Sequence, residues 1–265
     1  MLIYQAFLLL VIYTIAHSSK LQETDSYLSS VTKNILDGNV STLTTLLNQS
    51  KDLPLLLSTE FNMGSLSPLQ FASKMNSATI PLLLSLGSDP LQPHTETGTT
   101  PLIYTSRNGD MSGTELILKA SKNLPSFHID TPDTLGSSAL NVVAITCNVE
   151  MASKLISHGA RSDVPDHAGN TALHVGAWYC CDSEVGSYER GWGFAKALLK
   201  GLGDGDIDKL GGTGRTPLML AGMRGGTGFW EALIVGGADE RKVGSNKDGK
   251  SALQLREEYK QRTEL

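Results

Sequence analysis

The chain contains few of the residues from which catalytic and metal-binding sites are usually built. Only three of its 265 residues are cysteine, Cys147, Cys180 and Cys181, and a disulfide-based scaffold would need more. No Cys-x-x-Cys pair and no Cys/His spacing typical of zinc sites occurs, and the six histidines are scattered along the chain. We therefore predict no metal ion, no cofactor and no assembled set of catalytic residues.

Clusters of basic residues and long apolar segments are also scarce. The 22 lysines and arginines are outnumbered by 27 acidic residues, and they form no stripe of the kind that binds nucleic acid. Beyond residue 18, no apolar run approaches the ~20 residues that a membrane-spanning helix needs. Two glycine-rich stretches, 201–205 and 211–214, lack the Lys-Ser/Thr ending of a phosphate-binding loop, so we predict turns there.

What the chain does contain is a short pattern that recurs six times. Each copy begins with Ser or Thr, continues with Pro or Ala and then Leu, and the steps between copies are 33, 38, 33, 45 and 35 residues. Ser and Thr cap helices because the hydroxyl accepts a backbone N–H of the first turn, and Pro fits the first helical position because its N–H would be unpaired there. The copies are Ser67-Pro68-Leu69, Thr100-Pro101-Leu102, Ser138-Ala139-Leu140, Thr171-Ala172-Leu173, Thr216-Pro217-Leu218 and Ser251-Ala252-Leu253.

Each copy continues in a way that predicts a pair of helices. Small residues such as Ala72, Ala144 and Ala221 lie at the fifth or sixth position after the cap, where they let neighbouring helices approach closely. A second apolar segment follows, as in 151–156 and 230–235, and a glycine then ends it. Paired helices that recur about every 33 residues predict a stacked array, in which each unit buries its apolar face against its neighbours.

This pattern resembles the ankyrin repeat, most clearly at residues 166–177, which read Asp-His-Ala-Gly-Asn-Thr-Ala-Leu-His-Val-Gly-Ala. The resemblance covers residues 26–258 and implies an all-α solenoid of stacked helix-turn-helix pairs with hairpin-like loops. Its units start near residues 26, 64, 97, 135, 168, 213 and 248. The family's histidine, here His174, is expected to form hydrogen bonds within the capping turn. The other copies carry at this position Gln70, Ile103, Asn141, Met219 and Gln254.

Both ends of the chain carry features of secretory proteins. An apolar run followed by Ala16-His17-Ser18 predicts a signal peptide at residues 1–18, with a short segment 19–25 before the array; an uncleaved anchor is the alternative. Asn39 and Asn48 begin N-glycosylation sequons. The tail, residues 259–265, ends in Arg-Thr-Glu-Leu, which resembles a retrieval signal of the endoplasmic reticulum; an ordinary charged tail is the alternative.

The cysteines admit one disulfide in such an oxidising compartment. Cys147 and Cys180 occupy equivalent positions in adjacent units. Stacked helices lie about 8–10 Å apart, whereas a disulfide needs Cα atoms within about 7 Å, so an undistorted stack disfavours this pair. A twelve-residue insertion follows Cys181 and could distort the stack, which leaves a Cys147–Cys181 bond as the expected pairing. Unpaired thiols are the alternative.

The resemblance also places a surface for a protein partner. In ankyrin-like arrays the hairpin tips and the exposed side of the first helix form a concave face. Its positions lie one, three and four residues before each cap and seven and eight residues after it. Trp, Tyr and Arg dominate the energetics of protein interfaces, and several lie at these positions. The alternative is that Trp178 and Tyr179 are buried under the insertion at 182–191. The expected partner-binding residues are Arg107, Ile145, His167, Asn170, Trp178, Tyr179, Arg215, Met223 and Arg224.

The sequence therefore favours a non-catalytic protein-binding module of the secretory pathway, either secreted or kept in the lumen of the endoplasmic reticulum. After cleavage of the signal peptide we expect no membrane association, and no feature favours one oligomeric state. Two other functions stay open. One is a lumenal scaffold or chaperone-like factor, and the other is an enzyme or enzyme subunit that uses Cys180 or Cys181, although no group is marked to orient such a nucleophile.

Overall fold

The computed structural model describes residues 26–50, 53–58, 66–180, 187–245 and 249–263, and these form two compact units, residues 1–89 and 90–265. The described residues are largely helical and include no β-strand, which confirms the predicted all-α class. The predicted signal peptide and the segment 19–25 lie outside them. In the part described, no helix is long and apolar enough to cross a membrane.

The first unit holds helix pairs that follow the predicted pattern. Residues 26–36 are helical and turn at Gly38 (φ +65°) into the next helix, and the hydroxyl of Tyr27 donates to the carbonyl of Leu46 (2.6 Å). The side-chain amide of Asn76 donates to the carbonyl of Leu36 (3.1 Å), which ties this pair to the one that follows. The remaining elements are α2 (Val40–Asn48), α3 (Leu53–Ser58), α4 (Pro68–Met75), the 3₁₀ turn η1 (Ser77–Thr79) and α5 (Ile80–Ser85).

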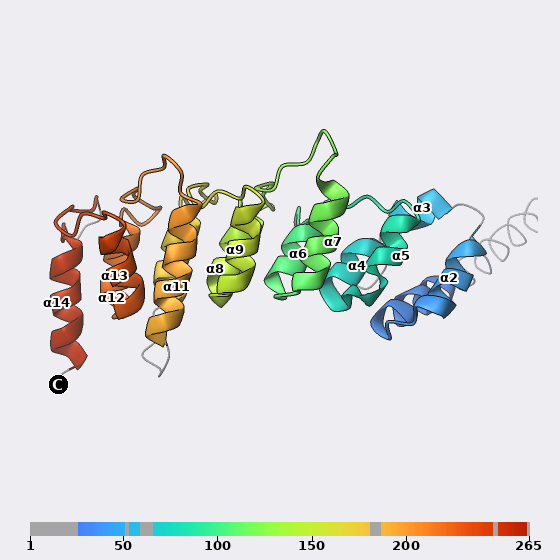
Figure 1. Cartoon of the computed structure of the whole chain (residues 1–265), viewed down its shortest axis with the longest axis horizontal. Coiled ribbons are helices and arrows are strands. Elements are labelled where there is room, and N and C mark those ends of the chain that lie inside the picture. Colours follow the sequence, from blue (N-terminus) through green and yellow to red (C-terminus); the bar gives the residue numbers. More distant parts are fainter. Residues whose placement is uncertain (1–25, 51–52, 59–65, 181–186, 246–248, 264–265) are drawn as a thin grey trace, which may run out of the picture. The chain divides into compact units, whose positions relative to one another are not determined.

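The second unit stacks its helices in two rows. The first helices of successive repeats, α6, α8, α10, α12 and α14, pack against one another in chain order, and α9, α11 and α13 pack together in the second row. Figure 1 shows α9, α11 and α13 following one another along the array. A set of large apolar side chains from both rows, among them Leu173, Phe194 and Phe229, is buried between the rows. The helices are α6 (Pro101–Arg107), α7 (Met111–Ser121), α8 (Ala139–Thr146), α9 (Val149–Ser157), α10 (Ala172–Tyr179), α11 (Ser187–Lys200), α12 (Pro217–Arg224), α13 (Thr227–Val235) and α14 (Ala252–Thr263).

The recurring Ser or Thr caps the first helix of each repeat, as the sequence predicts. In five of the six repeats the cap hydroxyl accepts the backbone N–H three residues later, at 3.2 Å for Thr216 and 3.4 Å for Ser67. The hydroxyl of Thr171 instead lies 2.8 Å from Nδ1 of His174. In four repeats the side chain at that third position reaches back and accepts the N–H of the cap residue, which satisfies a further orphan donor. These side chains are Gln70 (3.0 Å), His174 (3.2 Å), Met219 through its sulfur (3.5 Å) and Gln254 (2.9 Å).

The hairpin tips of neighbouring repeats are joined by backbone hydrogen bonds. The N–H of Thr134 donates to the carbonyl of Thr97 (2.9 Å), and that of His167 donates to Leu135 (3.0 Å). The tips therefore form a row of their own beside the first helices. This row and the exposed sides of α6, α8, α10, α12 and α14 make up the face that the sequence predicts as the concave surface.

Two elements extend beyond their predicted limits. Helix α14 continues to Thr263, past residue 258, because residues 256–263 contain neither glycine nor proline to stop it. Helix α11 begins at Ser187, so residues 187–191 of the insertion are helical, and residues 182–186 lie outside the described part. The helical part of the insertion packs on α13, where the hydroxyl of Tyr188 donates to a carboxylate oxygen of Glu231 (2.7 Å).

His174 should make the stability of the array depend on pH. Burial lowers the pKa of His174 to about 4, because the charged ring would lose its hydration, and the hydrogen bond to the carbonyl of Arg215 offsets only part of this effect. The unfolded chain, with an ordinary histidine pKa near 6.5, therefore binds more protons than the folded chain between pH 6.5 and 4. We expect the stabilisation to be complete above pH 6.5 and to fall by about 3 kcal/mol by pH 4.

The variant His174→Gln isolates this effect, because Gln70 and Gln254 already perform the same capping role in other repeats. Urea unfolding of both proteins from pH 7.5 to 4 should show that the stability difference between native protein and variant shrinks on acidification. Carboxyl groups titrate in both proteins and cancel in the difference. If the difference in unfolding free energy between the native protein and the variant stayed constant with pH, the lowered pKa of His174 would be contradicted.

Candidate partner-binding surface

A cavity of about 290 Å³ opens on the predicted concave face between α10 and α12. Its walls are mainly apolar, and Trp178 and Tyr179, at the end of α10, stay 39% and 49% exposed although both are large aromatic side chains. Such side chains at a protein surface mark a site of interaction more often than a solvated face. The lining residues are Asn170, His174, Val175, Trp178, Tyr179, Thr213, Arg215, Leu220 and Met223.

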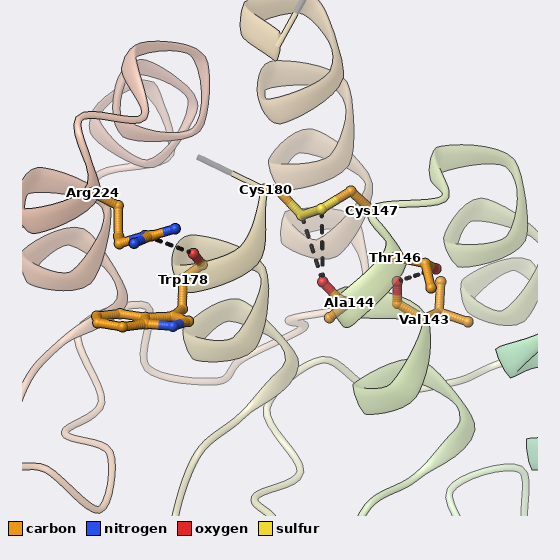
Figure 2. The surroundings of a disulfide bond; sticks show 7 residues. All are labelled: Val143, Ala144, Thr146, Cys147, Trp178, Cys180 and Arg224. Carbon is orange, nitrogen blue, oxygen red and sulfur yellow. Dashed lines mark hydrogen bonds between the residues drawn. A yellow bond between two sulfur atoms is a disulfide. The ribbon is translucent and has the colours of Figure 1, made fainter. Parts of the chain in front are cut away.

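Arg224 is held against the indole ring of Trp178. The central carbon of its guanidinium lies 5.0 Å from the centroid of the ring, within the range of a cation–π interaction. Its Nε donates to the backbone carbonyl of Trp178 (3.2 Å), as Figure 2 shows. The two contacts fix an arginine of α12 on an aromatic residue of α10, so both side chains are positioned before any partner arrives.

His174 links the cavity to the neighbouring repeat. Because its Nδ1 accepts from Thr171, the proton of the neutral ring is assigned to Nε2, which donates to the carbonyl of Arg215 (3.1 Å). Gly211 packs against this ring, and a Cβ there would lie 2.7 Å from a ring carbon of His174, which explains the glycine at the start of the stretch 211–214. With His174 neutral, the only ionised side chain in the lining belongs to Arg215.

A second hollow adjoins the first along the row of first helices. It encloses about 190 Å³ and shares Met223 with the first cavity, while its other walls come from α14 and the turn before it. Sequence analysis missed this part of the surface, although Tyr259 lies eight residues after Ser251, at the same position as Tyr179 after Thr171. Counting from the last cap would have found it. The lining residues are Met223, Lys250, Leu255, Glu258, Tyr259 and Arg262.

Comparison with known proteins finds a similar structure and a curated protein that is similar in sequence over part of its length. No family model matches the chain. It is 30% identical to the Neurogenic locus notch homolog protein 1 of Xenopus tropicalis, over an alignment of 166 residues that covers 59% of this chain and 6% of that protein. Its structure is similar to that of an ankyrin repeat domain from Acinetobacter baumannii, with a TM-score of 0.65, 21% identity, and coverage of 79% of this chain and 98% of that domain.

The chain has the ankyrin-repeat fold. The recognition made from the capping pattern is thereby confirmed, as is the solenoid of stacked helix pairs. This fold serves in general as a scaffold for binding other proteins, with recognition carried by the side chains that it displays.

The ankyrin array brings six of the nine predicted partner-binding residues together. Five of them line the first cavity and the sixth, Arg224, lies on the ring of Trp178. Arg107, Ile145 and His167 lie elsewhere on the same unit. Arg107 is 4.0 Å from the carboxylate of Asp133, Ile145 is half exposed on α8, and His167 is exposed at a hairpin tip. Binding by these residues stays a prediction.

The expected Cys147–Cys181 pairing is wrong about the partner of Cys147, since the structure joins Cys147 to Cys180 (Figure 2). The Cα atoms are 5.6 Å apart, closer than the spacing of stacked helices. The reason is that Cys147 leaves α8 in the left-handed conformation, with φ of +54°, and is therefore not held at the interhelical distance. Cys181 lies outside the described residues.

The conformation of Cys147 is that of a glycine in two other repeats. Gly109 and Gly225 stand at the same distance from their caps, with φ values of +70° and +71°. A cysteine tolerates this region poorly, and the disulfide holds it there. The two sulfur atoms lie 3.8 and 3.5 Å from the carbonyl oxygen of Ala144, as contacts only, because a disulfide has no S–H to donate.

No catalytic arrangement is visible among the residues described. The thiol of Cys180 is consumed in the disulfide, which removes one of the two nucleophiles considered for an enzyme. Burial raises the pKa values of Asp130 and Asp208, but these carboxylates accept backbone N–H groups of Arg161 and Asp239, so they tie loops of adjacent repeats together. Within the described ranges, no three His, Cys, Asp or Glu side chains gather as a metal site requires.

Removing the disulfide should lower the stability of the array in a way that depends on the residue placed at 147. In the chain-entropy model, releasing a link across 33 residues costs about 3–4 kcal/mol of unfolding free energy. Because position 147 has a positive φ, Cys147→Gly with Cys180→Ser should be about 1 kcal/mol more stable than Cys147→Ser with Cys180→Ser. Urea unfolding of the three proteins, compared at equal pH, checks both values. Equal stability of the two double variants would contradict a left-handed Cys147.

Proposed function

We propose that this chain is a protein-binding module of the secretory pathway that captures its partner on the concave face of the second unit, around Trp178 and Tyr179. One observation carries the proposal. Two large, exposed aromatic side chains line an apolar cavity at the positions where an ankyrin array presents its binding residues. Buried hydrogen bonds of His174 with Thr171 and with the carbonyl of Arg215 hold the walls of this cavity in place.

The location in the secretory pathway has its own support. The disulfide joins Cys147 to Cys180 across adjacent repeats, and such bonds persist chiefly in oxidising compartments. The first sequon is also sterically suited to carry a glycan. Asn39 is exposed at the start of α2, and its Oδ1 accepts the hydroxyl of Ser41 and the N–H of Thr42, so its amide nitrogen stays available. Asn48 is exposed at the end of the same helix.

Capture of the partner is expected to depend on the aromatic pair. The double substitution of Trp178 and Tyr179 by alanine should abolish recovery of the proteins that the native chain captures from a secretory extract, because each such aromatic typically carries at least ~2 kcal/mol of binding energy. Circular dichroism should show unchanged helicity, since both side chains are exposed. Ala substitution of Tyr188, an exposed aromatic on α11, serves as the matched control. Undiminished capture by the double variant would contradict the assignment of the binding site to Trp178 and Tyr179.

The route of the chain through the cell can be measured directly. In eukaryotic cells we expect a mature chain that starts at Ser19 and loses mass on glycosidase treatment. Ser41→Ala should abolish any glycan at Asn39 while keeping the capping oxygen of that residue, which Asn39→Gln would disturb. Ser50→Ala tests Asn48 in the same way. An intact, unglycosylated chain in the cytosol would overturn the secretory part of the proposal and leave the protein-binding part standing.

A further inference from the structure

The first cavity has the size of a side-chain pocket. Its volume of about 290 Å³ lies at the lower limit of cavities that hold whole small ligands, which run from roughly 300 to 1,000 Å³. The walls from Val175, Trp178, Leu220 and Met223 are apolar. The lining residues with polar groups are Asn170, His174, Tyr179, Thr213 and Arg215. A single large apolar side chain of a partner fits such a pocket better than a polar metabolite does.

The charges around the cavity have one sign. Its lining contains Arg215 and no carboxylate, and His174 is neutral because burial lowers its pKa to about 4. The adjoining hollow adds Arg262, while its carboxylate, Glu258, is paired with Lys250 (2.5 Å). The chain as a whole carries a net charge of −5, so this positive surface stands out from the rest of the protein. Charge complementarity therefore favours a partner with carboxylates.

Arg224 is prepared to bind one of these carboxylates. Its Nε is engaged with the carbonyl of Trp178 and its plane lies against the indole ring, so the side chain has already lost much of its rotational freedom. The two terminal nitrogens have no partner among the described residues. A planar guanidinium of this kind forms paired hydrogen bonds with a carboxylate, which a lysine in its place would not do.

We propose that the cavity receives a large apolar side chain from an acidic, extended segment of a partner protein, and that Arg224 binds a carboxylate next to that side chain. Because Met223 borders both hollows, the segment runs across α10, α12 and α14, with further carboxylates near Arg262. The inference rests on the proposed protein-binding function and adds the chemistry of the partner.

Selection of random linear peptides on the oxidised chain tests this chemistry. We expect the enriched peptides to carry Asp or Glu beside Phe, Trp, Leu or Met, and to lose binding in the Trp178→Ala variant. For one such peptide, Arg224→Gln should weaken binding about tenfold, and replacing the adjacent Glu of the peptide by Gln should weaken it as much. If the two groups bind each other, the double change should cost little more than either single change.

Arg190→Gln is the matched control, because Arg190 is an exposed arginine on α11, in the second row of helices. It should leave the affinity unchanged. Peptides that bind through Trp178 without an excess of acidic residues, or that bind equally to the Arg224→Gln variant, would overturn the inference and leave the protein-binding function intact. Recovery of no Trp178-dependent peptide would also overturn it, and the capture experiment with the double alanine variant then decides the proposed function separately.

Discussion

The hydrogen bond from a helix N–H to the hydroxyl of its Ser or Thr cap sets the register on which the rest of the array depends. It fixes where each first helix begins, and so determines which residues seven and eight positions later face outward. Met223 and Arg224 are placed in this way by the cap at Thr216. In the repeat of Trp178 and Tyr179, the hydrogen bonds between Thr171 and the ring of His174 fix the start of the helix instead, and the same count leaves both aromatic side chains exposed. The cap of the fourth full repeat does more than the others, since His174 also binds the carbonyl of Arg215 in the next hairpin tip.

The features predicted from sequence are those that local chemistry determines. Caps, glycine stops and apolar second helices are read from neighbouring residues, and the concave face follows by counting from each cap. The pairing of Cys147 could not be obtained this way, because it depends on a left-handed turn that the neighbouring repeats supply with glycine. The insertion gave no sign that its second half lengthens α11, since Gly191 and Gly193 suggest a loop. Gly191 instead allows close packing, since a Cβ there would lie 3.2 Å from the backbone nitrogen of Phe229.

The scaffold and the surface of this array are built from different interactions. The scaffold relies on buried apolar side chains and on neutral polar groups whose hydrogen bonds are satisfied inside the array, as in the ring of Thr171, His174 and Arg215. The surface keeps aromatic side chains and guanidinium groups exposed. A contact such as that of Arg224 on Trp178 combines the two roles, because it joins adjacent repeats and also orients a charge toward solvent.

The disulfide relates the proposed secretory location to the geometry of the surface. It joins the ends of α8 and α10, directly after Tyr179, and it does so with a cysteine in a backbone conformation that glycine adopts at the equivalent positions. In a reducing compartment this residue would retain the conformational cost of a non-glycine side chain and lose the link that offsets it. In a reducing compartment, an array with glycine at position 147 would be more stable than one with cysteine there. The cysteine at position 147 therefore supports the oxidising compartment that we propose from the N-terminal apolar run and the sequons.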